Sequence, residues 1–326
     1  MTQARIVQIT EGGAPDVMKL VTVELPAPAA NEVQLRQTAI GFNFIDTYQR
    51  SGYYPIPMPG GLGHEAAGVV EAVGADVKDL KVGDRVAYMN AGLGAYASHR
   101  NVAADKLVKL PDAVSDEQAA SLIFKGMTAQ YLVRRTHRVQ PGDIVLVHAA
   151  AGGVGQILVR WAKALGATVI GTAGSPAKCQ AAVEAGCDAA IDYSHADWVQ
   201  QVINATGGKK ARVVYDSVAK TTFLGSLDCA APFGLVVLYG AASGPAPDIH
   251  PEILNKKGCL FLTRPSVFPH NADPVRFREN AAELMDAIVS GTVTAPIGAR
   301  FALNDIVAAH QAAEARSYSG AMVIVP

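Results

Sequence analysis

The pattern of apolar and polar residues changes along the chain, and its two parts predict different kinds of fold. Up to about residue 124, short alternating stretches such as Val33–Ile40 and Gly68–Val73 are separated by many glycines and prolines. Alternation with a period of two is typical of half-buried strands. Short, irregular strands of this kind predict a small β-barrel rather than a parallel sheet. A short helical pattern at Asn43–Gly52 interrupts them and ends at a glycine.

From residue 144 the pattern becomes regular, because short apolar runs rich in β-branched residues alternate with stretches of helical spacing. Such runs are typical of parallel strands that are buried on both faces. We expect strands at Ile144–His148, Ala167–Thr172, Ala189–Asp192, Val213–Asp216, Leu235–Tyr239 and Leu260–Thr263. Helices expected at about 156–165, 176–186, 195–206 and 221–231 separate the first five. This order predicts a six-stranded, doubly wound parallel sheet with helices on both faces.

The segments on either side of this α/β region complete the predicted organisation. Ser115–Arg135 has helical spacing, and Ser115 with Gln118 three residues later is typical of a capping box. The tail predicts a helix, a strand, a second helix and a last strand, at Val275–Ser290, 295–301, Leu303–Ala315 and Ala321–Val325. We expect a β-barrel domain at 1–124 and a nucleotide-binding domain at 125–265. Residues 266–326 are expected to return to the first domain.

The strand–turn–helix at Asp143–Gly166 carries the most informative local pattern. Its turn has the form A-x-G-x-x-G at Ala150, Gly152 and Gly155, with alanine in place of the usual first glycine. Small residues let the backbone approach a pyrophosphate, and the helix N-terminus offers unpaired N–H groups and a partial positive charge. A packed turn alone also needs glycine, but the strands on both sides of this helix favour dinucleotide binding.

Composition excludes several function classes. The 326 residues are half apolar and 17% charged, with a net charge of −1, which fits a globular protein of two domains. No basic run favours nucleic acid or an anionic membrane, and no stretch predicts a signal peptide or a bilayer span. Four scattered cysteines form no C-x-x-C pair: Cys179, Cys187, Cys229 and Cys259. We therefore expect a cytoplasmic protein without disulfides or a thiolate zinc site.

Several longer motifs identify a family that this chain resembles. They are G-F-N-F-I-D-T-Y at Gly41–Tyr48, G-L-G-H-E-A-A-G at Gly61–Gly68, K-V-G-D-R-V at Lys81–Val86, K-G-M-T-A at Lys125–Ala129, V-V-Y-D-S-V at Val213–Val218 and L-T-R-P-S at Leu262–Ser266. With the glycine turn, they resemble the zinc-independent quinone oxidoreductases of the medium-chain dehydrogenase/reductase superfamily, which include the zeta-crystallins. The resemblance covers nearly the whole chain. It implies a GroES-like barrel, a Rossmann domain and NADPH-dependent reduction.

The resemblance also implies that no catalytic zinc is bound. Relatives with zinc place cysteine at the position of Asn43, histidine at that of His64 and a second cysteine near Phe124. His64 and the neighbouring Glu65 are present here, but one histidine and one glutamate do not make the three-ligand site that zinc needs. A structural, hydrogen-bonding role for His64 is therefore favoured, and no Lewis acid is expected to polarise a carbonyl.

The end of the second strand of the α/β region bears on the choice of cofactor. A site that prefers NAD usually has a carboxylate there for the ribose 2′-hydroxyl. Ala173 and Gly174 stand there instead, and Ser175, Lys178 and Tyr193 follow. A lysine without a nearby carboxylate favours a 2′-phosphate, so NADPH is the predicted cofactor. The alternative for Lys178 is a solvated lysine on a helix.

Further site residues follow from the resemblance. Asn43, Asp46, Tyr48 and Arg264 resemble the family's residues near the reacting groups. Tyr48 would donate a hydrogen bond to a developing oxyanion or only pack, and Asp46 would act or only cap and orient. Arg264 would polarise a substrate oxygen, hold the cofactor, or be a surface arginine. The implied cofactor site comprises Asn43, Phe44, Thr128, Tyr131, Gly152, Gly153, Val154, Gly174, Ser175, Lys178, Tyr193, Ser217, Tyr239, Ala241 and Arg264.

The function predicted from these observations is NADPH-dependent reduction of a quinone. A quinone is already electrophilic, so the protein mainly has to hold it near the nicotinamide and exclude water. An NADPH-dependent alkenal or enone reductase is the alternative within enzymes. A non-catalytic nucleotide-binding structural protein or an RNA-binding protein is the alternative from another class. We also expect a homodimer joined through the apolar edge strand at Cys259–Thr263.

Overall fold

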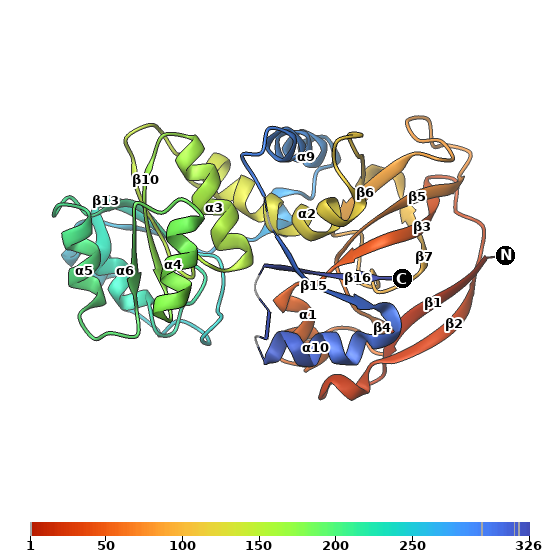
Figure 1. The fold of residues 1–326 in the computed structure, drawn as a ribbon, viewed down its shortest axis with the longest axis horizontal. Helices are drawn as coiled ribbons and strands as arrows, with labels where there is room; N and C mark the ends of the chain where they lie inside the picture. The colour runs from red at the N-terminus through yellow and green to blue at the C-terminus, as the bar shows by residue number, and fades with distance from the viewer. Residues whose placement is uncertain (1, 295, 316, 319) are drawn as a thin grey trace. The chain divides into compact units, whose positions relative to one another are not determined.

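The computed structural model describes residues 2–294, 296–315, 317–318 and 320–326 (Figure 1). The chain divides into two compact units, Met1–Met127 with Asn271–Pro326, and Thr128–His270. Each unit has its own hydrophobic core. Within the described residues, no helix combines the length and the apolar character needed to cross a bilayer.

The first unit is built from antiparallel strands, as the alternating pattern predicted. A small sheet has the order β2-β1-β4, and a larger one has the order β15-β16-β3-β5-β6-β8 with β7 also paired to β3. The first strands are β1 (Thr2–Ile9), β2 (Lys19–Leu25), β3 (Glu32–Gly41), β4 (Gly60–Gly61) and β5 (Glu65–Val73). The others are β6 (Arg85–Met89), β7 (His99–Ala103), β8 (Leu107–Lys109), β15 (Ile297–Ala302) and β16 (Ala321–Val325). The predicted strands at Val33–Ile40 and Gly68–Val73 are therefore confirmed.

The end of the chain completes this larger sheet. Strand β16 runs antiparallel to β3, with Val323 opposite Gly41, and β15 lies parallel to β16. The last strand therefore pairs within the first unit. Ala295, the first residue of the strand expected at 295–301, lies outside the described residues. Helices α9 (Pro274–Val289) and α10 (Ile306–Glu314) accompany these strands.

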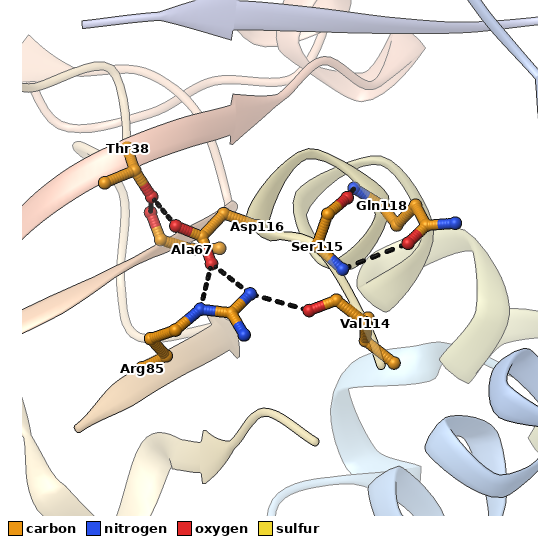
Figure 2. Close-up of polar contacts among 7 residues, drawn as sticks. All are labelled: Thr38, Ala67, Arg85, Val114, Ser115, Asp116 and Gln118. Atoms are coloured by element: carbon orange, nitrogen blue, oxygen red, sulfur yellow. Dashed lines mark hydrogen bonds and ion pairs between the residues drawn. The ribbon is translucent and has the colours of Figure 1, made fainter. Parts of the chain in front are cut away.

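Helix α2 (Asp116–Tyr131) begins with the predicted capping box (Figure 2). Gln118 N donates to Ser115 Oγ over 3.2 Å, and Ser115 N donates to Gln118 Oε1 over 3.0 Å. The helix was predicted to continue to Arg135, but a wider π-helical turn, Leu132–Thr136, follows Tyr131. In that turn the Leu132 carbonyl accepts from both His137 N and Tyr215 Oη, which replaces regular α-helical bonding.

The second unit, all of whose residues are described, contains the predicted six-stranded parallel sheet in the order β11-β10-β9-β12-β13-β14. Its strands are β9 (Ile144–Val147), β10 (Thr168–Ala173), β11 (Ala189–Asp192), β12 (Ala211–Asp216), β13 (Ala230–Leu238) and β14 (Phe261–Thr263). Its helices include α3 (Gly153–Ala164), α4 (Pro176–Glu184), α5 (Trp198–Ala205), α6 (Phe223–Cys229), α7 (Glu252–Lys256) and α8 (Val267–His270).

The strand order explains how helices cover both faces of this sheet. The chain moves from β9 to β11 in one direction, and from β12 to β14 in the other. Because parallel crossovers are right-handed, α3 and α4 lie on one face and α6 on the opposite face. Helices α5 and α6 contact each other and pack Trp198 and Phe223 into the core. The point where the direction changes, between β9 and β12, is where such sheets bind ligands.

Candidate functional site

The glycine turn between β9 and α3 has the close packing that a nucleotide site requires. A Cβ atom at Gly155 would lie 2.2 Å from Ala149 O and 2.9 Å from the Cα atom of Ala150. Only glycine fits there, so the turn stays tight. Gly152 caps α3 and is exposed, and Gly153 and Val154 form the first turn of the helix. The N–H groups of that first turn have no partners within the helix, and they make it suited to bind an anion.

A buried polar network lies next to this turn, and the sequence analysis did not identify it. His148 has no exposed surface, its Nδ1 lies 2.7 Å from Thr172 Oγ1, and its Nε2 lies 2.9 Å from Ser226 Oγ. Ser226 Oγ also donates to Asp216 Oδ2 over 2.7 Å. Burial lowers the pKa of His148, so the ring is neutral. The network ties β9, β10, β12 and α6 together around the turn.

The residues expected to hold a 2′-phosphate meet at the end of β10. A Cβ atom at Gly174 would lie 3.1 Å from Tyr193 Oη, so the tyrosine hydroxyl covers this glycine. Ser175 caps α4 and accepts a hydrogen bond from Lys178 N over 3.4 Å. Lys178 is exposed on the first turn of α4. The structure thus brings Gly174, Ser175 and Tyr193 together, with Lys178 one helical turn away.

One carboxylate near this position was not considered in the sequence analysis. Asp192 is paired with Ala173 in the register of β10 and β11. Its Oδ1 accepts from Ser194 N over 2.9 Å, and hydrogen bonds from Ser194 hold the pKa of Asp192 below its usual range. The sequence at the end of β10 does not reveal this carboxylate, because Asp192 belongs to the neighbouring strand β11.

A second group of expected cofactor residues lies elsewhere in the second unit. The ring of Tyr131 stacks on His270, with centroids 4.4 Å apart and an interplanar angle of 10°. Burial raises the pKa of both Tyr131 and Tyr239, so both phenols are neutral. Arg264 Nη1 donates to Leu238 O over 3.1 Å, which holds the guanidinium beside the end of β13.

The remaining residues of this group are placed by the backbone. Ser217 follows β12 directly, and its carbonyl accepts from Ala242 N over 3.0 Å, next to Ala241. Thr128 is buried on α2. His270 is the member of the group that sequence reasoning missed, and its stacking partner lies far away along the chain.

In the first unit, Asn43 lies at the start of helix α1 (Phe44–Arg50). Its Nδ2 donates to Glu65 Oε1 over 2.7 Å. Lys125 Nζ lies 3.3 Å from the same oxygen and donates to Phe42 O over 2.8 Å, and Phe124 N donates to Glu65 Oε2 over 2.6 Å. Burial raises the pKa of Glu65, and the Lys125 ammonium opposes this shift. The sequence analysis did not identify Lys125 as part of the site.

The other residues at zinc-ligand positions have structural partners. His64 Nε2 lies 3.0 Å from Gln49 Oε1, and its ring lies 5.6 Å from that of Phe124. Burial, aided by the charge of Arg100, lowers the pKa of His64 to about 4, so the imidazole is neutral near pH 7. Across the residues described, no three histidine, cysteine, aspartate or glutamate side chains are grouped to hold a metal ion.

The last candidates lie on α1. Asp46 has no exposed surface, and its Oδ2 accepts from Asn43 N over 3.0 Å and from Tyr96 Oη over 2.8 Å. Burial raises the pKa of Asp46 to about 7. Tyr48 is half-buried and its ring packs edge-on against Tyr53 and Tyr54, and Phe44 is about half exposed. Asp46 therefore forms a capping interaction at the start of α1, and capping was one of the two roles expected for it.

The comparisons with known proteins cover the whole chain. The model of the alcohol dehydrogenase GroES-like domain matches residues 29–112, and that of the zinc-binding dehydrogenases matches residues 153–274. A quinone oxidoreductase of Pseudomonas aeruginosa is 46% identical over 324 residues, which is 99% of this chain and 100% of that protein. The chain belongs to the quinone oxidoreductases of the medium-chain dehydrogenase/reductase superfamily. The family and fold predicted from the sequence are confirmed.

Two further relatives show how the family varies. The crystal structure of Escherichia coli quinone oxidoreductase in complex with NADPH superimposes with a TM-score of 0.95 at 45% identity, and the match covers 99% of this chain and 100% of that one. A 2-haloacrylate reductase of a Burkholderia species is 43% identical over 326 residues, covering 98% of each chain. This quinone oxidoreductase family member therefore has relatives with more than one acceptor, and it is itself an oxidoreductase.

Proposed function

We propose that the protein transfers reducing equivalents from NADPH to a quinone. The observation that carries this conclusion is the 46% identity to a quinone oxidoreductase over 324 residues. The turn at Gly155, where only glycine fits, supports it. Quinones are electrophilic without further activation, so the protein's task is to position the acceptor and to exclude water.

The second unit fits NADPH. A pyrophosphate would approach the turn at Gly152 and Gly155 and accept hydrogen bonds from the first N–H groups of α3, where the helix dipole adds a favourable partial charge. The 2′-phosphate would be held at Gly174 by Ser175, Lys178 and the Tyr193 hydroxyl. The E. coli relative, whose structure contains NADPH, aligns over 99% of this chain.

Residues of the first unit are proposed to act on the reacting groups. NADPH, when bound, supplies a hydride from its nicotinamide ring. Tyr48 is half-buried on α1. Its hydroxyl would donate a hydrogen bond to the oxygen that gains negative charge. Asn43 would present its carboxamide in a fixed orientation, because Glu65 holds its Nδ2. Asp46 would orient Asn43 through the backbone. In the second unit, Arg264 would hold the cofactor or a substrate oxygen.

The test is consumption of NADPH with and without 1,4-benzoquinone under anaerobic conditions, followed through the nicotinamide absorbance. We expect rapid oxidation that requires both protein and quinone. Hydroquinone should form in equal amount to the NADPH consumed by either route, because two semiquinones disproportionate to one quinone and one hydroquinone. A semiquinone signal in electron paramagnetic resonance during turnover would indicate single electrons, and turnover without it would indicate hydride transfer. Tight NADPH binding without turnover of any acceptor would instead support a non-catalytic nucleotide-binding protein.

Reduction of a conjugated alkene is the second candidate function. It is favoured by the 2-haloacrylate reductase that matches 98% of this chain at 43% identity. The same assay with 2-chloroacrylate and with an enone, at matched concentrations, separates the two functions by the ratio of kcat/KM. A higher value for either alkene than for any quinone would replace the leading proposal.

Assembly and location complete the proposal. Strand β14 lies at the edge of the six-stranded sheet of the second unit, and Phe261 and Leu262 are 61% and 36% exposed. An exposed apolar edge favours pairing with a second copy, so we propose a homodimer through β14. All four cysteines are free thiols, which suits the reducing cytoplasm.

A further inference from the structure

Lys125 and Glu65 form a buried ion pair that contacts Asn43 directly. The Glu65 side chain has no exposed surface, and that of Lys125 is 11% exposed. Three donors converge on this carboxylate, namely Asn43 Nδ2, Phe124 N and Lys125 Nζ, and the ammonium also donates to Phe42 O. Each carboxylate oxygen of Glu65 therefore has a hydrogen-bond donor, which is the condition for a charge to be tolerated inside a protein.

The backbone around this pair leaves space for it. A Cβ atom at Gly41 would lie 2.3 Å from Glu65 Oε1 and 2.1 Å from Ala120 O, so the carboxylate occupies the place where a side chain would stand. Gly41 ends β3 and Glu65 begins β5, and the two residues are paired in register. The ion pair is thus seated between the sheet and α2.

The charges of this pair dictate the orientation of Asn43. If the carboxamide were turned over, its Oδ1 would face the Glu65 Oε1 carboxylate oxygen at the position now held by Nδ2, which is 2.7 Å away. Two acceptors at that distance repel each other, whereas N–H to carboxylate is a strong, charge-assisted hydrogen bond. The Lys125 ammonium lies 3.3 Å from Glu65 Oε1 and opposes the effect of burial on the pKa of Glu65, so it favours the carboxylate and with it this orientation. The amide oxygen of Asn43 is consequently turned away from Glu65.

We propose that Lys125 and Glu65 are positioning residues for the reaction, and that they act by fixing the carboxamide of Asn43 in one orientation. The pair provides a buried positive charge and a buried acceptor, and Glu65 accepts hydrogen bonds from Asn43 Nδ2 and Phe124 N. This inference rests on the proposed function, because it assigns Asn43 a part in the reaction. The pair itself touches neither acceptor nor cofactor in this role.

The test is a double-mutant cycle on kcat, with NADPH and 1,4-benzoquinone at saturation. Lys125→Met and Glu65→Gln should each lower kcat by about 10- to 100-fold, the range expected when a reacting group is misplaced. The dissociation constant for NADPH should change less than about two-fold, because the phosphate-binding residues are unaltered. In an Asn43→Ala background, either substitution should lower kcat by less than about two-fold further. The reason is that the side chain which the pair is proposed to orient is then absent.

A matched control comes from the other end of α2. Arg85 donates to Asp116 Oδ1 over 2.6 Å and joins β6 to the helix N-terminus (Figure 2). Arg85→Met should lower the melting temperature and leave kcat within about two-fold of wild type. Equal losses of kcat in Arg85→Met and Lys125→Met would show general loosening of α2 and overturn the proposal. Multiplicative losses in the Asn43→Ala background would overturn it as well.

Two further variants cover the case in which a lone buried charge prevents folding. The Glu65→Gln/Lys125→Met double variant is neutral and should fold, because removing both charges avoids an uncompensated one. Lys125→Arg keeps the charge and should retain more of kcat than Lys125→Met. A neutral double variant with full kcat would refute the positioning role.

A spectroscopic measurement separates this inference from the proposed function. The Asn43 side-chain NH₂ resonances, assigned by their absence in Asn43→Ala, should be shifted in wild type and should move in Lys125→Met. Unchanged resonances in Lys125→Met would overturn the positioning role even in an active enzyme. Wild type that reduces no quinone, but shows the expected shift, would overturn only the proposed function.

Discussion

Replacing Asp46 by asparagine tests whether this carboxyl group is neutral in the folded protein. Asp46 is fully buried, and burial raises its pKa from 3.8 to about 7. Its Oδ2 accepts two hydrogen bonds, which the Oδ1 of asparagine would retain, and its other oxygen has no partner among the described residues. Asparagine therefore imitates the protonated acid and cannot ionise.

The sign and size of the effect follow from the two pKa values. A pKa raised by folding gives stability below the unfolded pKa, and this stability is lost as the pH rises through the folded pKa. Each pKa unit corresponds to about 1.36 kcal/mol, so the shift of about three units gives about 4 kcal/mol in all. The interval of about two pH units between about pH 5 and the folded pKa accounts for about 2.7 kcal/mol of this stability. Wild type should lose that stability by about pH 8.5.

The assay is urea unfolding of wild type and Asp46→Asn at both pH values, followed by circular dichroism. Tryptophan fluorescence is unsuitable, because Trp161 and Trp198 both lie in the second unit. Other groups also contribute over this range, such as His64, whose pKa is about 4 in the folded protein and 6.5 when unperturbed, but they are present in both proteins and cancel in the difference. The stability of Asp46→Asn relative to wild type should rise by about 2.7 kcal/mol from about pH 5 to about pH 8.5. An equal difference at both pH values would refute the reasoning.

Three other predictions concern cofactor, metal and assembly. Lys178→Ala should weaken NADPH by about 10- to 100-fold and leave NADH nearly unchanged, because a charge-assisted hydrogen bond contributes about 1.5–3 kcal/mol; equal weakening of both would contradict the 2′-phosphate assignment. Elemental analysis should find no stoichiometric zinc, and chelators should leave activity intact; about one zinc per chain, with activity lost on its removal, would contradict this. Light scattering should give a dimer that Phe261→Lys dissociates, since a charge in the edge strand opposes pairing, and a wild-type monomer at micromolar concentration would count against β14 as the interface.

The local pattern of the sequence was enough to predict most regular elements. The strand, turn and helix at Asp143–Gly166, the alternating strand β3 and the capping box of α2 depend on neighbours within a few residues, so their signals are contiguous. Strands β7 and β8 were missed, because each is short and is defined by its pairing with a distant strand. Strand β7 is formed by His99–Ala103, whose polar residues give no alternation, and its order comes from pairing with β3.

The candidate site was predicted unevenly, for a related reason. The glycine turn and the 2′-phosphate residues lie close together in sequence, and the family motifs placed Asn43 and Arg264. The resemblance also brought Lys125 and Glu65 into view as parts of motifs, but it gave neither of them a role.

The tertiary structure alone decided which polar groups share a buried environment. Asn43, Glu65 and Lys125 are 22 and 60 residues apart, yet they meet around one carboxylate. His148 and Ser226 meet across 78 residues in the same way. Such contacts depend on the pairing of distant strands and on the loss of water around each charge. Both follow from the packing of the whole unit, so a local pattern carries no record of them.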